Sequence, residues 1–195
     1  MSTARPDCVA LFGTSADPPT CGHQALLQGL LRHFPLVATW ASDNPLKQHG
    51  ASLEQRAALL GALVQELAEP RLLLAQELSS PWAITTLERA AARWPGAELV
   101  FVVGSDLLEQ LPRWRQAEAV LAACRLAVVP RQGWPPQEPA LARLRQLGAR
   151  LELLPLQIPA SASSEVRRGP EPQQVPAAVW PVLLKHNLYG VAGPS

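Results

Sequence analysis

The sequence predicts an α/β fold, a single Rossmann-like, doubly wound domain with a mostly parallel sheet flanked by helices. Short apolar runs alternate with longer helical patterns, which is typical of βαβ units around a parallel sheet. Residues 99–103 (LVFVV) are five apolar residues in succession, as expected for a strand buried on both faces. A chain of 195 residues suits one such domain, 1–195, and we find neither an internal repeat nor a linker that would divide it.

Each expected strand is a short apolar run bounded by turn residues. The six ranges are 8–12, 36–40, 72–75, 99–103, 126–129 and 151–156. Two polar segments rich in proline or glycine, 42–51 (SDNPLKQHGA) and 130–139 (PRQGWPPQEP), are expected to be loops.

The expected helices lie between these runs. A helix from about residue 22 to 34 carries four leucines on one stripe. Ser52 and Gln55 form a capping-box pattern at the start of a helix that runs to about residue 68. Residues 79–81 (SSP) open a further helix, because proline is favoured in a first turn. Residues 175–185 are expected to form a closing helix.

Composition narrows the class of protein. The hydrophobic share is 48%, which excludes a disordered chain. The 17 basic and 16 acidic residues are intermixed, so we expect neither a nucleic-acid nor a membrane partner. Three cysteines at no metal-ligand spacing indicate thiols in a reducing compartment. The N-terminus has no signal-peptide pattern, so a cytoplasmic location is expected. The sequence leaves open whether the chain self-associates.

Residues 13–23 (GTSADPPTCGH) connect the first strand to the first helix, and this turn predicts a phosphate site. A helix start presents free N–H groups, and the helix dipole favours anions there. Gly13 and Gly22 allow a ligand to approach the backbone closely. Thr20 and His23 lie three residues apart, so both can face one phosphate chain. The alternative for His23 is a histidine that only satisfies backbone groups at the helix start.

This turn resembles the signature of the nucleotidylyltransferase superfamily, in which a G-[TS]-F-[DN]-P turn precedes [HT]-x-G-H. Residues 20–23 (TCGH) match the second half in its threonine form. Two departures stand out. Ala16 occupies the place where phenylalanine is usual, and one extra residue separates Gly13 from Asp17.

Further segments resemble the nicotinate-nucleotide adenylyltransferase family within this superfamily. Residues 103–114 (VGSDLLEQLPRW) are similar to its GAD-x-L-x-x-L-x-x-W block, with Ser105 in place of alanine. Residues 129–133 (VPRQG) resemble its V-x-R-P-G, and residues 80–87 (SPWAITTL) resemble its S-x-Y-T-I-D-T-L.

Two more matches complete the resemblance. Lys47 matches the basic residue of the family's second loop, and Arg56 matches an arginine that follows this loop. Residues 162–167 (ASSEVR) resemble the family's S-S-T-x-I-R, with Ala162 for the first serine. Hydroxyl groups at a helix start with a cation one turn later suit a leaving pyrophosphate.

The resemblance implies a reaction in which nicotinate mononucleotide, or nicotinamide mononucleotide, attacks the α-phosphorus of ATP and pyrophosphate leaves. Such a reaction depends on positioning and charge stabilisation rather than on a covalent intermediate. The resemblance assigns the catalytic roles to Thr20, His23, Lys47 and Arg167. Mg²⁺ is expected to bind through the phosphates and water, so no protein metal site is expected.

The resemblance also implies two groups of binding residues. The group expected to bind ATP is Gly13, Thr14, Ser15, Gly22, His23, Gly104, Asp106, Ser163, Ser164 and Arg167. The group expected to bind the mononucleotide is Lys47, Thr85, Thr86 and Trp114. Trp114 is the candidate for stacking on the pyridine ring, and backbone N–H groups around Thr85 and Thr86 are the candidates for its carboxylate.

Alternatives remain open at this stage. Trp114 could instead belong to the core. Asp106 could cap a helix rather than bind a ribose, and Ser163 could be an ordinary N-cap. Another transferase of the same fold, acting on pantetheine phosphate or a cytidine nucleotide, is the alternative activity. A nucleotide-binding protein that has lost turnover is the third, because alanine replaces larger family residues at positions 16, 83 and 162.

Overall fold

The computed structural model describes residues 6–44, 47–156, 158 and 162–191. Within them, six parallel strands form one sheet in the order β3-β2-β1-β4-β5-β6. The strands are β1 (Cys8–Thr14), β2 (Val37–Ala41), β3 (Leu72–Leu74), β4 (Glu98–Gly104), β5 (Arg125–Val129) and β6 (Arg150–Leu153). The α/β, doubly wound prediction is therefore confirmed, and each strand is parallel to its neighbour.

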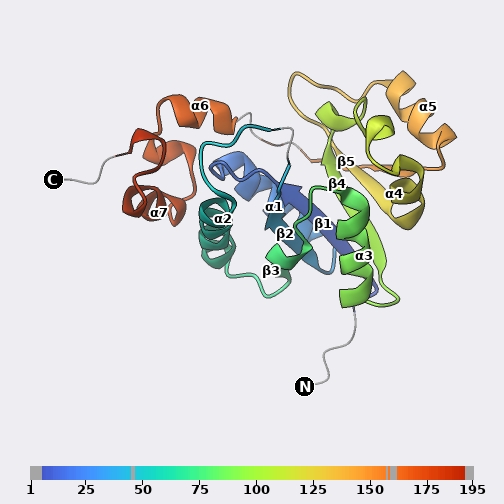
Figure 1. Cartoon of the computed structure of the whole chain (residues 1–195), viewed down its shortest axis with the longest axis horizontal. Helices are drawn as coiled ribbons and strands as arrows, with labels where there is room; N and C mark the ends of the chain where they lie inside the picture. The colour runs from blue at the N-terminus through green and yellow to red at the C-terminus, as the bar shows by residue number, and fades with distance from the viewer. Residues whose placement is uncertain (1–5, 45–46, 157, 159–161, 192–195) are drawn as a thin grey trace.

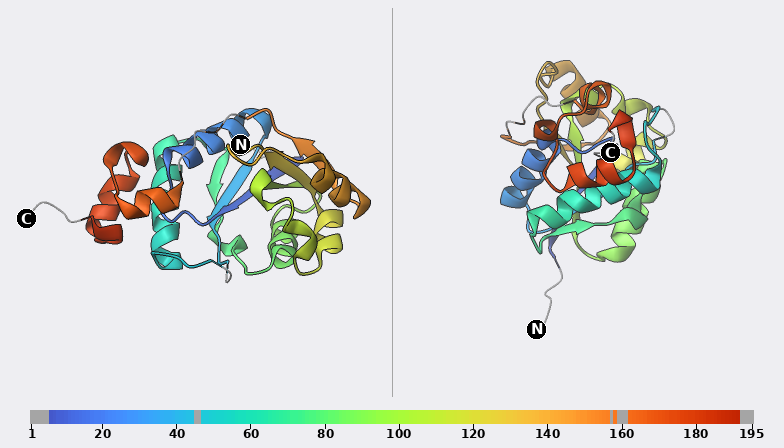
Figure 2. Two further views of the ribbon diagram at one scale, coloured as in Figure 1. Left: turned by 90° about the horizontal axis from the view of Figure 1, so that it is seen from above. Right: turned by 90° about the vertical axis from the view of Figure 1, so that its left-hand side faces the viewer.

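Seven α-helices and several 3₁₀ turns lie between or after the strands of the described chain, and α6 and α7 follow the last strand. The helices are α1 (Cys21–His33), α2 (Leu53–Leu67), α3 (Ala83–Arg93), α4 (Ala117–Ala123), α5 (Glu138–Gln146), α6 (Ser163–Arg168) and α7 (Val179–Lys185). Helix α1 lies on one side of the sheet and α3 and α4 on the other, while α6 and α7 lie beside α2 at one end of the molecule (Figures 1 and 2).

Side-chain alternation along the strands divides the core between these two faces. Ala10 and Phe12 of β1 pack in a cluster with leucines of α1 and α2 and with Val179 of α7. Val9 and Leu11 pack on the opposite face, in a cluster that includes residues of α3, α4 and α5. Because successive strand residues point to opposite faces, one apolar run serves both clusters.

Local signals account for the best-defined helix boundary. Ser52 caps α2 by accepting from the backbone N–H of Gln55 at 3.2 Å, and the Gln55 side chain accepts from the N–H of Ser52 at 3.0 Å. This is the capping box expected from the sequence.

Two expected elements are shorter than predicted. The helix expected at 175–185 begins only at Val179, because Val175 precedes Pro176 and adopts an extended conformation. The strand expected at 151–156 covers Arg150–Leu153. The N–H of Leu154 still donates to Val128 O, but Pro155 has no N–H to continue the ladder.

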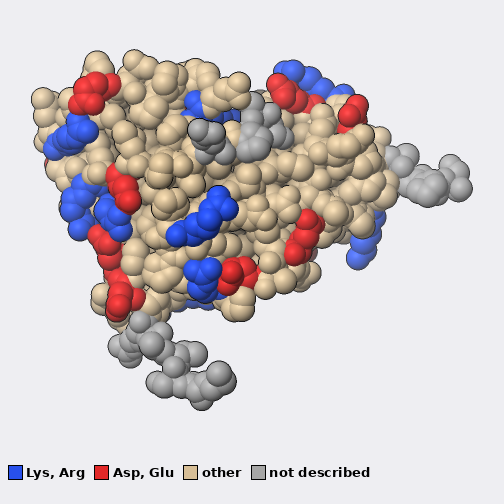
Figure 3. Space-filling model, turned by 180° about the vertical axis from the view of Figure 1, so that it is seen from behind, with Lys and Arg blue, Asp and Glu red and all other residues tan. Residues whose placement is uncertain are grey.

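No helix in the described ranges is long and apolar enough to cross a membrane. On the face seen in Figure 3, basic and acidic side chains are scattered, and neither sign forms a continuous patch.

Gly13 is required by packing within the sheet. It pairs in register with Trp40 of β2, which is buried. A Cβ at position 13 would lie 2.8 Å from two carbons of the Trp40 indole, closer than real Cβ contacts. The sequence suggests that Gly13 admits a ligand, whereas the structure shows that the indole of Trp40 occupies the space beside it.

We expect Gly13→Ala to lower the free energy of unfolding by about 1–3 kcal/mol, the usual cost of overpacking a well-packed core. Urea unfolding of the variant measures this loss. Gly169→Ala is the control, because nothing lies within 4 Å of a Cβ built there. A Gly13→Ala variant as stable as the control would show that Trp40 yields its place without cost.

Candidate active site

The strand order reverses between β1 and β4, since β1 is followed by β2 on one side and β4 by β5 on the other. In open α/β sheets, ligands bind outside the carboxyl ends of the strands at such a reversal. The turn after β1 carries the expected phosphate-binding residues, and the segment after β4 carries residues 105–114. The fold therefore brings the two main sequence motifs to adjacent strand ends.

His23 lies in the first turn of α1, and both of its ring nitrogens have partners. Its Nδ1 accepts from the backbone N–H of Thr20 at 3.1 Å and lies 2.9 Å from Thr20 Oγ1. Its Nε2 lies 2.9 Å from Thr14 Oγ1. Because a backbone N–H can only donate, Nδ1 is the unprotonated nitrogen and Nε2 carries the hydrogen. The structure thus brings together Thr14, Thr20 and His23.

The His23 ring is neutral at physiological pH. Burial, followed by the positive charges of Arg131 and Lys47, lowers the pKa of His23 to about 4. Lys47 is exposed on the loop after β2 and Arg131 is exposed after β5, so two cations from separate loops act on one imidazole. A neutral hydrogen-bond donor that experiences the positive charge of two cations suits an anionic ligand.

The turn after β1 is held in place by buried charges. Arg56 is 2% exposed, and its Nη1 donates to the backbone oxygens of Ser15 at 2.8 Å and Ser42 at 2.9 Å. Its Nε donates to Ala51 O at 3.3 Å, and burial lowers its pKa. Arg56 therefore joins the turns after β1 and β2 from within the core.

Helix α6 reaches the same turn from the C-terminal part of the chain. Ser163 Oγ donates to Pro18 O at 2.9 Å, and Arg167 Nη1 donates to Asp17 O at 2.6 Å. Ser164 is exposed. The structure thus brings the expected pyrophosphate-binding residues onto the phosphate turn.

The end of β4 positions Asp106 beside Arg131. Arg131 Nη1 donates to Asp106 Oδ2 at 2.8 Å, and the N–H of Arg131 donates to Ser105 Oγ at the same distance. A Cβ at Gly104 would lie 2.3 Å from Asp106 Oδ1. Gly104 therefore leaves room for the Asp106 carboxylate to fold back towards the strand end.

The start of α3 differs from the expectation at Thr86. Its side chain is buried and donates to Leu78 O at 2.9 Å, while its N–H donates to Trp82 O at 3.2 Å. Both groups are used within the protein because the helix turns Thr86 towards the core. Thr85, which is half-buried, stays a candidate, and the structure shows no acceptor for its N–H among the described residues.

Trp82, at the N-cap of α3, replaces a family tyrosine and is 42% exposed. The guanidinium carbon of Arg115 lies 5.0 Å from the centroid of its ring, a cation–π distance. Arg115 is the neighbour of Trp114 in sequence, so the start of α3 and the segment after β4 meet at this contact.

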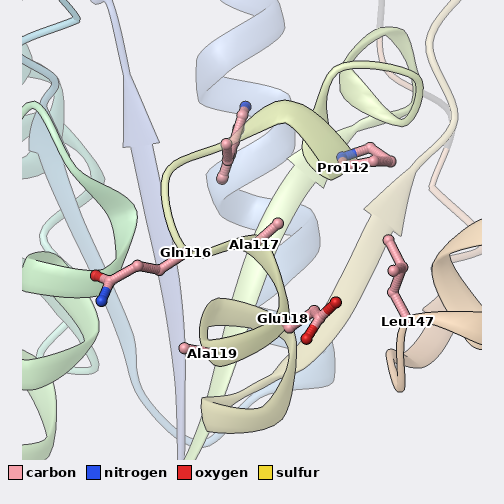
Figure 4. A pocket seen from close by; sticks show the side chains of 7 residues that line it. Pro112, Gln116, Ala117, Glu118, Ala119 and Leu147 are labelled. Atoms are coloured by element: carbon pink, nitrogen blue, oxygen red, sulfur yellow. The ribbon is translucent and has the colours of Figure 1, made fainter.

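Trp114 is half-buried and has two environments. Its ring meets Phe101 edge to face at a centroid distance of 6.1 Å, and Phe101 meets Trp40 in the same way at 6.4 Å. It also lines a cavity of about 420 Å³ with Pro112, Gln116 and residues of α4 and with Leu147 (Figure 4). The core role and the binding role weighed from the sequence are therefore both compatible with its position.

Three residues of this region had no role in the sequence-based site. Asp17 and Tyr189 are joined by a hydrogen bond, and Arg131 acts on His23 and Asp106. Asp17 and Arg131 carried a usable signal, because both lie in segments that resemble family motifs, whereas Tyr189 carried none.

Comparison with known families gives a consistent result. A family model described as cytidylyltransferase-like matches residues 11–169. A protein of Synechocystis sp. named as a probable nicotinate-nucleotide adenylyltransferase is 36% identical over 197 residues, covering 93% of this chain and 98% of the relative. A protein of the same name from Chlorobaculum tepidum is 32% identical, covering 92% of this chain and 97% of the relative.

Solved structures share the fold. The Plasmodium falciparum nicotinic acid mononucleotide adenylyltransferase complexed with NaAD aligns with a TM-score of 0.77 and 17% identity, covering 94% of this chain and 98% of that chain. The same protein complexed with APC aligns with a TM-score of 0.74 and 18% identity. At such identities the likeness concerns the fold alone.

The lowered pKa of His23 should make the stability of the ligand-free protein depend on pH. An unfolded histidine titrates near 6.5, so between pH 6.5 and about 4 the unfolded chain binds a proton that folded His23 does not. Stability should therefore fall as the pH drops through this window, by up to about 1.4 kcal/mol per pH unit from this residue.

Urea unfolding at pH 6.5, 5.5 and 4.5 compares the wild type with His23→Asn, which cannot titrate. We expect a shallower loss of stability on acidification in the variant. The pKa of His49 is also lowered, chiefly by burial, but His49 is present in both proteins and its contribution cancels. Equal slopes would mean that His23 titrates normally in the folded chain.

Proposed function

The chain belongs to the cytidylyltransferase-like family and, within it, to the nicotinate-nucleotide adenylyltransferases, and from this premise we propose the reaction that it catalyses. It transfers the adenylyl group of ATP to nicotinate mononucleotide and releases pyrophosphate, a step of NAD biosynthesis. The observation that carries this proposal is the position of His23 at the strand reversal, where its ring contacts Thr14 and Thr20. The positive charges of Lys47 and Arg131 act on the same ring.

The chemistry requires little of the protein beyond positioning. A phosphate oxygen of the mononucleotide forms a bond to the α-phosphorus of ATP, and the bond from that phosphorus to the bridging oxygen of pyrophosphate breaks. The attacking phosphate is already an anion at neutral pH, so no general base is needed. Catalysis consists of aligning the two phosphates and stabilising the charge that develops on the oxygens.

His23 is suited to the α-phosphate because it donates a hydrogen bond without carrying a charge. Its Nε2–H points at Thr14 Oγ1, at the mouth of the turn, while Thr20 fixes Nδ1 as the acceptor. We assign the Nε2–H to an oxygen of the α-phosphate, which would replace Thr14 Oγ1 as its acceptor. Lys47 and Arg131 supply positive charge.

The β- and γ-phosphates are assigned to Arg167 and Ser164. Ser163 donates its one hydroxyl hydrogen to Pro18 O, so it reaches a phosphate only if that bond exchanges. Ser164 is exposed and lies next to it at the start of α6. We assign Asp106 to a ribose hydroxyl, since Arg131 already compensates its charge.

The mononucleotide is assigned to the surface between the start of α3 and Trp114. Trp114 offers the aromatic face for the pyridine ring, and the N–H of Thr85 is available to the carboxylate. Arg115, held over Trp82, places a cation next to this surface.

Mg²⁺ is assigned to the phosphates of ATP, with water completing its shell, where it would neutralise charge on the leaving group. Among the described residues, no group of three or more His, Cys, Asp or Glu side chains could hold a metal ion. Asp17, the carboxylate within the phosphate turn, already accepts from Gly50 and Tyr189. Both Asp17 oxygens are thus engaged by protein donors, which favours an ion held by the nucleotide phosphates.

We further propose that the chain acts as one domain in the cytoplasm. The three cysteines are unpaired, as expected in a reducing compartment.

With ATP and Mg²⁺, we expect the protein to convert nicotinate mononucleotide to its adenine dinucleotide. Pyrophosphate release with nicotinate mononucleotide, nicotinamide mononucleotide and phosphopantetheine as acceptors measures the activity and its selectivity. His23→Ala is the control, and it should lower kcat by about 10²- to 10³-fold, the usual loss for one preorganised contact to transition-state charge. Turnover with phosphopantetheine alone would replace the proposal with a different acceptor.

Trp114→Ala should lower kcat/KM for the mononucleotide by about 5- to 150-fold, the scale of one base–aromatic stacking contact. The KM for ATP should change far less, because His23 and Arg167 hold the nucleotide. Trp114→Phe is the matched variant, since it keeps an aromatic ring against Phe101 and should retain most of the activity. Steady-state kinetics with each substrate, together with a thermal melt, distinguish a stacking role of Trp114 from a core role. Equal losses for both substrates with a large fall in Tm would assign Trp114 to the core only.

A further inference from the structure

Asp17 is a buried carboxylate at the centre of the phosphate turn. It is 1% exposed, and its two oxygens accept hydrogen bonds from residues far away in the sequence. The N–H of Gly50 donates to Oδ2 at 2.8 Å, and the hydroxyl of Tyr189 donates to Oδ1 at 2.6 Å. His49 Nδ1 lies 3.6 Å from Oδ2. The turn, the loop after β2 and the C-terminal segment therefore converge on one side chain.

Arg167 meets the same carboxylate from α6. Its Nη1 donates to the backbone oxygen of Asp17 at 2.6 Å and lies 3.4 Å from Oδ2. The Arg167 side chain is 31% exposed, and among the described residues its Nη2 and Nε have no acceptor. A guanidinium has five N–H donors in a rigid fork, so fixing one nitrogen orients the others. Asp17 thus holds one side of the fork and leaves the other side open to a ligand.

Gly50, Tyr189 and Arg167 are closely packed around Asp17. A Cβ at Gly50 would lie 2.8 Å from Tyr189 Cε1 and 2.9 Å from Arg167 Cδ. The backbone of the loop after β2 therefore passes where the tyrosine ring meets the arginine stem. Tyr189 itself has φ 56° and ψ 29°, a left-handed conformation that is rare for a bulky residue. An unfavourable backbone conformation persists only where tertiary contacts stabilise it. Here the hydroxyl contact with Asp17 and the packing against Gly50 provide those contacts.

The hydroxyl of Tyr189 remains a donor at any physiological pH. Burial, followed by the hydrogen bond to Asp17 and its charge, raises the pKa of Tyr189. This donor matters because Asp17 places a negative charge beside the site assigned to the phosphates of ATP. A carboxylate that lost a donor would turn towards Arg167, its nearest cation, and compete with phosphate for the guanidinium.

On the basis of the proposed function, we propose that Tyr189 is a positioning residue for ATP. Its hydroxyl holds Asp17 in the orientation in which Arg167 is anchored through Nη1 and presents its remaining N–H groups to the β- and γ-phosphates. Tyr189 touches no substrate and acts through Asp17 and Arg167. The C-terminal segment is in this way part of the nucleotide site.

Tyr189→Phe tests this role, because it removes the hydroxyl and keeps the ring. We expect the affinity for α,β-methylene-ATP, measured by calorimetry, to fall about 5- to 20-fold, the loss expected for one mispositioned charge-assisted hydrogen bond. The KM for ATP should rise in parallel, with kcat and the KM for the mononucleotide changed less than about threefold, because Arg167 binds phosphates that are charged before and during the reaction.

A double-mutant cycle with Arg167→Met separates positioning from a general structural effect. If Tyr189 acts through Arg167, Tyr189→Phe should weaken binding by less than about twofold in the Arg167→Met background. Gly50→Ala should reproduce the loss, since its Cβ would displace both the tyrosine ring and the arginine stem. Glu66→Ala is the control, because it removes the acceptor that anchors the C-terminal segment through the N–H of Ala178 and Glu66 does not contact Asp17.

The outcomes are distinct. Unchanged affinity in Tyr189→Phe, or an equal loss in both backgrounds, overturns the role of Tyr189 and leaves the proposed function intact. An equal loss in Glu66→Ala also overturns it, since any loosening of the C-terminal segment would then suffice. A wild-type protein that does not bind the analogue overturns the positioning role and the proposed function together.

Discussion

The buried Asp17 carboxylate is the interaction on which the arrangement of the site depends. A charge that is withdrawn from water must be compensated by donors, and here the donors come from the loop after β2 and the C-terminal segment. Arg56 meets the complementary requirement, since its buried guanidinium is satisfied by backbone oxygens of the turns after β1 and β2. Two buried charges of opposite sign therefore hold together segments that the sheet alone would leave as separate loops.

This arrangement is compatible with the proposed polyanion site, although the net charge of the chain is only +1. The acidic side chain nearest to the phosphate turn is enclosed and compensated, whereas Lys47, Arg131 and part of Arg167 remain exposed around it. His23 stays neutral among these cations because burial opposes its protonation. The electrostatic potential at the site depends on which charged side chains are exposed and which are buried, much more than on the net charge of the chain.

On the other side of the site, core packing involves Trp114, the residue proposed to bind the mononucleotide. Trp40, Phe101 and Trp114 form a continuous series of edge-to-face contacts from beneath Gly13 to the segment after β4. A change at one end of this series can reach the phosphate turn through Gly13 and the mononucleotide surface through Trp114. The aromatic packing of one face of the sheet thus links the two surfaces proposed for the substrates.

The sequence by itself determined the kind and order of the elements and the main motifs of the site. Apolar runs, the capping box at Ser52 and the helix start at Thr20 depend on residues close together in the chain, so a local reading finds them. Only the tertiary structure decided that Thr86 turns inward, that Trp40 occupies the space beside Gly13, and that Tyr189 reaches Asp17. The partners in that last contact are 172 residues apart, and the donors of a buried carboxylate are selected by how the chain packs in space, which no local pattern records.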